Sequence, residues 1–315
     1  MYFGVDYYPE HWPEERWEVD AQLMQAANFN VVRVAEFAWA KLEPSQGRFD
    51  FDWLDRAIEV LNKYGLKVII GTPTATPPKW LIDKHPDILP RDADGHVRGF
   101  GSRCHYCATN EAYQWHTDII VGELARHYGQ HPGVIGWQTD NEFGCHSTVR
   151  CYCDSCQRAF RRWLQRKYGT LDALNKTWGT IFWSQTYTDW DQVIIPRKTV
   201  AEHNPGLLLD YYRFASDMKV QYQKRQIEIL RRHTTNQFIT HNLMALFPEI
   251  DYYKLGADLD FVSWDNYPRL LGSPERARLA MTHDLMRGIK KENFWVMEEQ
   301  SGPSGWGIVQ STPRP

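Results

Sequence analysis

The chain has 315 residues, with 36 Lys and Arg against 39 Asp and Glu and a formal net charge of −3. A chain of this length buries a large core, and its near-neutral charge argues against electrostatic binding to nucleic acid or to an anionic membrane. The longest apolar runs are too short to cross a bilayer and the N-terminal residues show no secretion signal, so we expect a cytoplasmic protein.

The chain alternates short apolar runs with longer amphipathic segments. The short runs are rich in β-branched and aromatic residues and predict strands at 2–7, 31–36, 66–71, 134–139, 238–241, 260–264 and 294–297. The amphipathic segments predict helices at 14–27, 51–64, 112–128, 154–168, 207–233 and 274–287. Gly65, Gly169 and Gly288 stand just past three of these helices, where a left-handed residue closes the last turn.

This alternation predicts an α/β fold with a parallel sheet buried on both faces, either doubly wound or a (β/α)8 TIM barrel. The segment 99–104 lacks the third glycine of the dinucleotide-binding fingerprint, which argues against the doubly wound arrangement. Seven strands are counted rather than eight. We therefore expect an incomplete TIM barrel with seven of its eight strands.

Polar side chains follow the carboxyl ends of the predicted strands. Asn141 and Glu142 follow the fourth strand, and Glu298 and Glu299 follow the seventh. These ends meet at one mouth of a parallel barrel. Two carboxylates there fit glycoside hydrolysis, in which one donates a proton to the leaving oxygen and the other attacks the sugar or activates water. A single acidic residue in such a place is more often an ion-pair partner or a helix cap, and the paired occurrence after two apolar strands is what favours catalysis.

Aromatic residues are abundant, with 14 Trp and 16 Tyr. They indicate either a large aromatic core or a cleft lined by rings, whose flat apolar faces and polar edges suit sugars.

Several motifs in order along the chain resemble glycoside hydrolase family 42, the β-galactosidases. They are YYPEHW at 7–12, RVAEFAW at 33–39, LEPSQGRFD at 42–50, PTATPPKWL at 73–81, WQTDNEFG at 137–144, YGTLDALNKTW at 168–178 and HDLMRG at 283–288. The resemblance implies one catalytic TIM-barrel domain over residues 1–315, a fragment without the family's later domains. It also suggests a homotrimer, although the part that would assemble it is absent.

The resemblance implies retaining release of terminal β-D-galactose from β-galactoside substrates, with Glu142 as acid/base and Glu298 as nucleophile. Glu142 must stay protonated, so we expect it to be less solvated than Glu298 or to have its pKa raised by the charge of Glu298. Neighbouring strand residues face opposite ways, so only one of Glu298 and Glu299 faces the barrel interior. Glu299 stands where the family pattern has a neutral residue; we expect it to face away or pair with a base, and it is the alternative nucleophile.

The resemblance also assigns substrate contacts to Arg103, Asn141, Tyr267 and Trp306. Arg103 offers a donor fork for vicinal hydroxyls or for a catalytic carboxylate, and Tyr267 either donates to the nucleophile or packs beside Pro268. Arg33 and Glu36, after the second strand, are weaker candidates for the same pocket.

Six cysteines fall at positions 104, 107, 145, 151, 153 and 156. Spacing alone favours a zinc site of Cys104 and Cys107 with Cys153 and Cys156. The resemblance instead implies a structural Zn2+ on Cys107, Cys151, Cys153 and Cys156, with no organic cofactor. Cys104 stands where the family pattern has Arg, which leaves open whether it replaces Cys107. Four buried thiols without metal are the remaining alternative.

Two other functions stay open from the sequence. One is a related retaining glycanase that acts on another sugar. The other is a zinc-bearing carbohydrate-binding fragment without catalysis.

Overall fold

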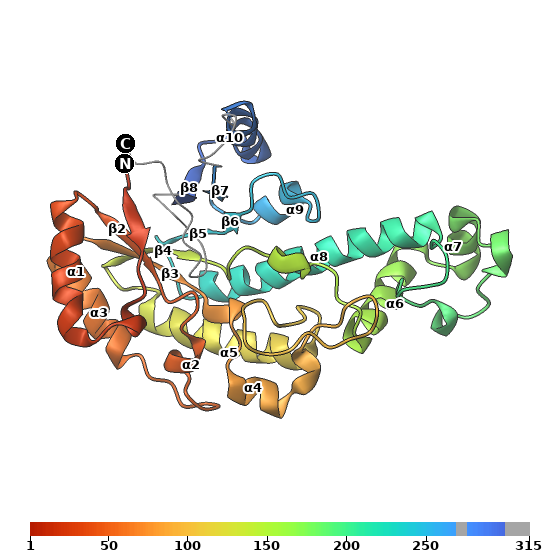
Figure 1. Ribbon diagram of the computed structural model, residues 1–315, viewed down its shortest axis with the longest axis horizontal. Helices are drawn as coiled ribbons and strands as arrows, with labels where there is room; N and C mark the ends of the chain where they lie inside the picture. The colour runs from red at the N-terminus through yellow and green to blue at the C-terminus, as the bar shows by residue number, and fades with distance from the viewer. Residues whose placement is uncertain (269–275, 300–315) are drawn as a thin grey trace.

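The computed structural model describes residues 1–268 and 276–299, and the strands of these residues form two parallel sheets, one of five strands and one of three (Figure 1). The strands are β1 (Gly4–Asp6), β2 (Val31–Val34), β3 (Lys67–Gly71), β4 (Val134–Gln138), β5 (Phe238–Thr240), β6 (Asn242–Leu243), β7 (Ser263–Asn266) and β8 (Trp295–Glu299). All neighbouring pairs are parallel, in the orders β1-β2-β3-β4-β5 and β6-β7-β8. Only His241 separates β5 from β6, so the strands of the described residues occupy seven positions, as predicted.

Helices follow the strands along the chain. They are α1 (Glu14–Ala26), α2 (Trp39–Leu42), α3 (Asp52–Lys63), α4 (Lys79–Lys84), α5 (Glu111–Tyr128), α6 (Asp154–Tyr168), α7 (Leu171–Trp178), α8 (Pro205–Arg231), α9 (Tyr252–Gly256) and α10 (Arg276–Lys290). All six predicted helices are present. Gly65 and Gly169 have positive φ angles and end their helices. The expectation for Gly288 was wrong, because α10 continues through it to Lys290.

The barrel core forms where apolar strand residues meet the helices that surround them. Every residue of β2 is buried, as are all but the first residue of β3, which is the pattern of strands covered on both faces. Trp39, Trp137 and Trp264 are fully buried in this core. For these three residues, the aromatic richness of the sequence reflects core packing rather than a sugar-binding cleft.

A second, smaller hydrophobic cluster lies away from the strands. Helix α8 has 27 residues, which corresponds to about 40 Å, and its N-terminal part extends beyond the barrel to meet α6 and α7 (Figure 1). Phe160, Leu174, Trp178 and Tyr211 are buried there together with four of the cysteines. We call this region the helical extension. The single catalytic domain over residues 1–315 stays a prediction.

Candidate active site

Arg33, at the end of β2, joins carboxylates and amides from several strand ends. Its guanidinium lies 3.1 Å from Asp6 Oδ2, 3.1 Å from Glu36 Oε1, 2.7 Å from Gln138 Oε1 and 2.7 Å from Glu298 Oε1. The side chain of Arg33 is only 2% exposed. Burial would lower the pKa of Arg33, but the negative charges of Asp6, Glu36 and Glu298 raise it well above its usual value. Arg33 is therefore a fixed positive charge at the mouth of the barrel.

Glu36 reaches this cluster because the chain turns sharply after β2. Ala35 has φ +75°, a left-handed conformation that is uncommon for a residue with a side chain. A Cβ on Gly71 would lie 2.4 Å from the Cβ of Glu36, so glycine at the end of β3 makes room for it. Glu36 then accepts hydrogen bonds from Arg33 and, at 2.9 Å, from Tyr8. The two residues given less weight from the sequence, Arg33 and Glu36, thus lie at the centre of the site.

Glu298 lies in β8 with three donors around its carboxylate. Its Oε1 accepts from Arg33 at 2.7 Å and lies 3.1 Å from Asn242 Nδ2, while Oε2 accepts from the Tyr267 hydroxyl at 2.5 Å. Burial would raise the pKa of Glu298, but the charge of Arg33 and the hydrogen bonds from Tyr267 and Arg33 outweigh it, and the pKa is lowered. Glu298 is therefore held as a carboxylate.

Glu142 follows β4 on a backbone that alternates through left-handed conformations. Asp140 has φ +51°, Glu142 φ +43° and Gly144 φ +87°. The Glu142 amide donates to Asn242 Oδ1 at 3.0 Å, and its Oε2 lies 2.8 Å from Arg103 Nη2. Left-handed residues with side chains cost free energy and concentrate at functional sites. Here they turn the chain so that Glu142 reaches the mouth beside the neighbouring strands.

The two glutamates are equally shielded from solvent but have opposite pKa shifts. Their side chains are 13% exposed for Glu142 and 12% for Glu298, so the expected difference in solvation is wrong. Burial raises the pKa of Glu142; Arg103 opposes the rise and the charge of Glu298 adds to it. The alternative expectation, that the charge of Glu298 raises the pKa of Glu142, agrees with this arrangement.

The carboxylates of Glu142 and Glu298 lie close together. One oxygen from each, together with one from Asp265, lie within 4.8 Å of one another. In retaining glycosidases the two carboxyl groups are about 5–5.5 Å apart, against about 6.5–9.5 Å in inverting enzymes. The contact within 4.8 Å places both carboxylates in one site.

Asp265 and Asn242 complete the cluster, and neither was identified from the sequence. Asp265 is buried; its Oδ2 lies 2.8 Å from Asn242 Nδ2, and its Oδ1 has no hydrogen-bond partner among the described residues. Burial raises the pKa of Asp265 well above its usual value, and the charges of Glu298 and Glu142 raise it further. Asn242 Nδ2 also lies 3.0 Å from Asn141 Oδ1. An amide nitrogen has two hydrogens, so it serves two of its three acceptors at a time.

Of the other residues predicted from the sequence, some lie in the site or at its rim, and one lies outside the described residues. Asn141 is buried beside Glu142, with its Nδ2 3.4 Å from Glu142 Oε2, and Tyr267 is 45% exposed at the rim. Glu299 is exposed and accepts from Asn266 at 2.9 and 3.1 Å, so it faces away from Glu298 as expected, with an amide rather than a base as its partner. Trp306 lies outside the described residues.

Four cysteines meet at the base of the helical extension. The Sγ atoms of Cys107, Cys151, Cys153 and Cys156 lie within 4.8 Å of one another, and all four residues are buried and free of disulfides. The Cys107 sulfur lies 3.4 Å from the Cys156 sulfur and 3.5 Å from the Cys153 sulfur. Tetrahedral zinc with Zn–S bonds of about 2.3 Å places its sulfurs about 3.8 Å apart. The four thiols thus fit a closed zinc site.

Cys104 does not belong to this cluster. Its sulfur lies 3.3 Å from the sulfur of Cys145, and both residues are buried. The zinc site favoured by spacing alone, with Cys104 as a ligand, is therefore not the one that the structure assembles.

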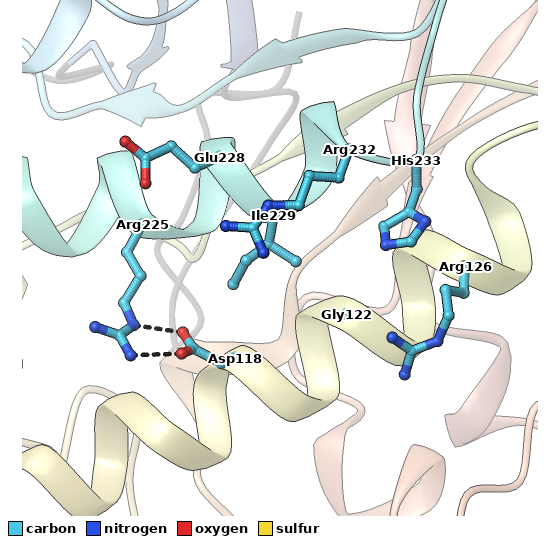
Figure 2. A pocket seen from close by; sticks show the side chains of 8 residues that line it. All are labelled: Asp118, Gly122, Arg126, Arg225, Glu228, Ile229, Arg232 and His233. Atoms are coloured by element: carbon cyan, nitrogen blue, oxygen red, sulfur yellow. Dashed lines mark hydrogen bonds and ion pairs between the residues drawn. The ribbon is translucent and has the colours of Figure 1, made fainter.

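A separate groove of about 370 Å³ lies between α5 and α8 (Figure 2). Arg126, Arg225, Arg232 and His233 line it, and Arg225 forms a two-pronged ion pair with Asp118 across the groove. None of the strand-end residues lines this groove.

Among the described residues, no helix has both the length and the apolar character needed to cross a bilayer.

Comparison with known proteins shows which family the chain matches. The model of glycoside hydrolase family 42, described as β-galactosidase, matches residues 6–315. A protein named β-galactosidase from Thermus thermophilus is 52% identical over 99% of this chain and 51% of its own length, and one from Halorubrum lacusprofundi is 48% identical over 97% of this chain and 46% of its own. The crystal structure of a β-galactosidase from the psychrophilic Marinomonas ef1 superposes with a TM-score of 0.94 at 45% identity, covering 100% of this chain and 50% of that one. The chain spans about half the length of the curated relatives it matches.

Proposed function

The chain belongs to glycoside hydrolase family 42, and from this membership we propose that it carries the catalytic barrel of a retaining β-galactosidase. The reaction would release terminal non-reducing β-D-galactose from β-galactosides by double displacement. Glu142 would be the acid/base and Glu298 the nucleophile. The observation that carries the proposal is the pair itself: two glutamates with oxygens within 4.8 Å and pKa shifts in opposite directions.

In the first step, Glu142 donates its proton to the glycosidic oxygen while Glu298 attacks the anomeric carbon. The bond between that carbon and the leaving oxygen breaks, and a galactosyl ester forms on Glu298. Arg33 and Tyr267 keep Glu298 ionised before the attack, and they also fix the direction of its two oxygens. Arg33 cannot release its proton under these conditions, so it acts only as a positioning group.

In the second step, water replaces the leaving group. Formation of the ester removes the negative charge of Glu298, so the influence that raised the pKa of Glu142 disappears. Glu142, which gave up its proton in the first step, therefore stays ionised and takes a proton from water. The resulting nucleophile attacks the anomeric carbon from the face that the aglycone left, and the ester bond breaks to release Glu298 as a carboxylate. Two inversions give net retention of configuration.

The substrate contacts come from the family resemblance and are proposals. Arg103, which holds Glu142 at 2.8 Å, and Asn141, beside it, would bind galactose hydroxyls at the acid/base side. Tyr267 would act at the nucleophile side, where its hydroxyl meets Glu298. Trp306 would supply an apolar wall for the sugar ring.

The proposal is tested with 4-nitrophenyl β-galactoside and the variants Glu298→Ala and Glu142→Ala. Each variant should lose at least about 10³-fold in turnover. Added azide should then give α-galactosyl azide with Glu298→Ala, since azide attacks in place of the nucleophile, and β-galactosyl azide with Glu142→Ala, since azide replaces water. Glu299→Ala is the matched control and should retain activity.

Three outcomes would contradict the proposal. If Glu299→Ala were inactive and Glu298→Ala active, Glu299 rather than Glu298 would be the nucleophile. Faster cleavage of the corresponding glucoside or mannoside would show that the preferred sugar is not galactose. Binding of galactose without any cleavage by the parent chain would favour the non-catalytic carbohydrate-binding fragment.

We also propose a structural Zn2+ on Cys107, Cys151, Cys153 and Cys156. Four thiolates close the coordination shell and leave no position for water, so the metal would fasten the segment before α5 to the start of α6 rather than take part in the reaction. Metal analysis of the purified chain should find about one zinc per chain, and Cys151→Ser should abolish it. The homotrimer and the cytoplasmic location stay predictions.

A further inference from the structure

Cys104 and Cys145 form a second thiol pair beside the proposed active site. Their sulfurs lie 3.3 Å apart, although the residues are 41 positions apart along the chain. Cys104 lies on the segment between β3 and α5, and Cys145 lies on the segment after β4. Neither sulfur belongs to the four-cysteine cluster, so the zinc site does not account for them.

The backbone at each cysteine is anchored, which keeps the two sulfurs facing each other. The amide of Cys104 donates to the Ala75 carbonyl at 2.7 Å, and the amide of Cys145 donates to the Glu142 carbonyl at 3.0 Å. A disulfide bond is about 2.05 Å long. The sulfurs therefore need to approach by a little over 1 Å, a change that side-chain rotation can supply without separating the anchored segments.

We propose that Cys104 and Cys145 are an oxidation site, which a small peroxide converts to an intramolecular disulfide. The sulfur of Cys145 attacks one peroxide oxygen, the O–O bond breaks, and a sulfenic acid and one water form. The sulfur of Cys104 then attacks the Cys145 sulfur, and the hydroxyl leaves as a second water. Two thiols and one hydrogen peroxide thus give one disulfide and two waters: the thiols are oxidised by two electrons and the peroxide is reduced.

The order of attack follows from exposure. Cys145 is 5% exposed and Cys104 is 2% exposed, so the small oxidant reaches Cys145 first. Cys104 is then the resolving thiol, already in contact. Because the resolving step is intramolecular and needs little motion, it competes effectively with further oxidation of the sulfenic acid.

The disulfide would join the two segments that carry Arg103 and Glu142. At present their contacts are the Arg103–Glu142 ion pair at 2.8 Å and hydrogen bonds such as those from Arg98 to the carbonyls of His146 and Ser147. A covalent link between residues adjacent to these contacts would hold both segments together when the ion pair opens. It would also restrict the unfolded chain, which stabilises the folded state.

The test oxidises the zinc-loaded chain with dilute hydrogen peroxide, blocks remaining thiols by alkylation, and maps peptides by mass spectrometry. We expect a linked pair of peptides containing Cys104 and Cys145, two hydrogens lighter than the reduced pair, which a phosphine reductant separates. Oxidation should raise the Tm of the parent chain by several °C, and Cys104→Ser and Cys145→Ser should each abolish that rise.

The proposal is overturned if both cysteines remain alkylated after oxidation, if they become separate sulfinic acids, or if either links to a cysteine of the zinc cluster instead. The mapping of the parent chain decides this even where a serine variant does not fold. No readout uses hydrolysis, so the outcome is independent of the proposed activity.

Discussion

The barrel mouth and the base of the helical extension both bury groups that can carry negative charge. The two regions differ in what balances that charge. At the mouth, the guanidinium of Arg33 lies within 3.1 Å of carboxylates from Asp6, Glu36 and Glu298. At the extension, four thiols face one another within 4.8 Å. The mouth carries its own counter-charge, whereas four adjacent thiolates need an external cation. The mouth should therefore keep its geometry without additions, and the extension should depend on metal.

The two regions also differ in how the chain assembles them. Asp6, Arg33, Glu142 and Glu298 come from separate strands and meet only when the barrel forms. Three of the four thiols lie within six residues, and Cys107 alone comes from a distant segment. The extension thus needs one long-range contact, and the mouth needs nearly the whole sheet.

Metal removal is the change expected to have the largest effect, because it should destabilise the helical extension and leave the barrel mouth intact. Structural zinc contributes about 10–16 kcal/mol of binding free energy in small zinc-finger peptides. We expect Cys153→Ser to lose its zinc and to show fast amide hydrogen exchange in α6 and α7, while β2 to β4 stay protected.

The matched control for that experiment is Cys145→Ser under reducing conditions. It replaces a buried cysteine outside the cluster, so zinc content and exchange in α6 and α7 should stay as in the parent chain. Equal protection of the extension in Cys153→Ser and the parent would show that the apolar cluster around Phe160 and Tyr211 holds the extension without metal.

The next largest effect should be the loss in free energy of unfolding caused by Arg33→Met. Removing one partner of a buried charge cluster leaves the others uncompensated, which typically costs about 3–5 kcal/mol. Arg103→Met should cost about 1 kcal/mol, since the Arg103 side chain is 20% exposed against 2% for Arg33 and water screens its ion pair. Urea denaturation at pH 7 measures both free energies of unfolding, and equal losses would mean that solvent reaches both arginines equally.

The sequence predicted more of the barrel than of the site. The seven strands and six long helices followed from apolar periodicity, because both faces of a parallel sheet must be covered. Helix α7 was missed although its signals are present: Thr170 caps its first turn and Gly179, with φ +64°, ends it. Its eight residues are too few for periodicity to stand out, but the cap pair alone indicates a helix.

Asp265 shows why the site was less predictable. It lies between Trp264 and Tyr267 in a segment already identified as a strand end. Which side chains face the interior depends on register, and the β7–β8 pairing shifts between Trp264 and Asp265, so that Asp265 pairs with Glu298. A one-residue irregularity changes which face each side chain takes, and no local sequence signal marks it. The central role of Arg33 depends on a different long-range arrangement, because Arg33 lies on β2, between β1 and β3, and meets Glu298 only when the strands assemble.

Asp6→Asn should change the free energy of unfolding by a smaller amount, and the size of this change should depend on pH. Burial raises the pKa of Asp6 to about 7; Arg33 opposes the rise, and Glu36 and Glu298 add to it. A carboxyl group with a raised folded pKa stabilises the fold below its unfolded pKa of about 4, and this stability is lost as pH rises through about 7. At about 1.4 kcal/mol per unit, Asp6→Asn should exceed the parent in stability by at most about 4 kcal/mol at pH 8 and match it near pH 4.

Urea denaturation at several pH values between 4 and 8 measures this difference. The exposed Asp258 provides a control for the substitution itself, since Asp258→Asn makes the same chemical change outside the Arg33 cluster. A destabilised Asp6→Asn at pH 8 would show that the Asp6–Arg33 contact at 3.1 Å outweighs the cost of burying the charge.

The smallest expected effect concerns the pKa of Glu142 itself. The negative charge of Glu298 raises the pKa of Glu142, while Arg103 and Arg33 lower it. In Glu298→Gln the raising charge is gone and both arginines remain, so the pKa of Glu142 should be lower than in the parent chain. Carboxyl 13C NMR of the variant measures the titration, with the Glu142 signal assigned by its absence in Glu298→Gln/Glu142→Gln. Glu299→Gln removes a neighbouring carboxylate that faces away, and it should leave the titration of Glu142 unchanged. An unchanged value in Glu298→Gln would mean that burial alone sets the protonation of Glu142, and loss of the Glu298 charge would then not prepare Glu142 to act as a base in the second step.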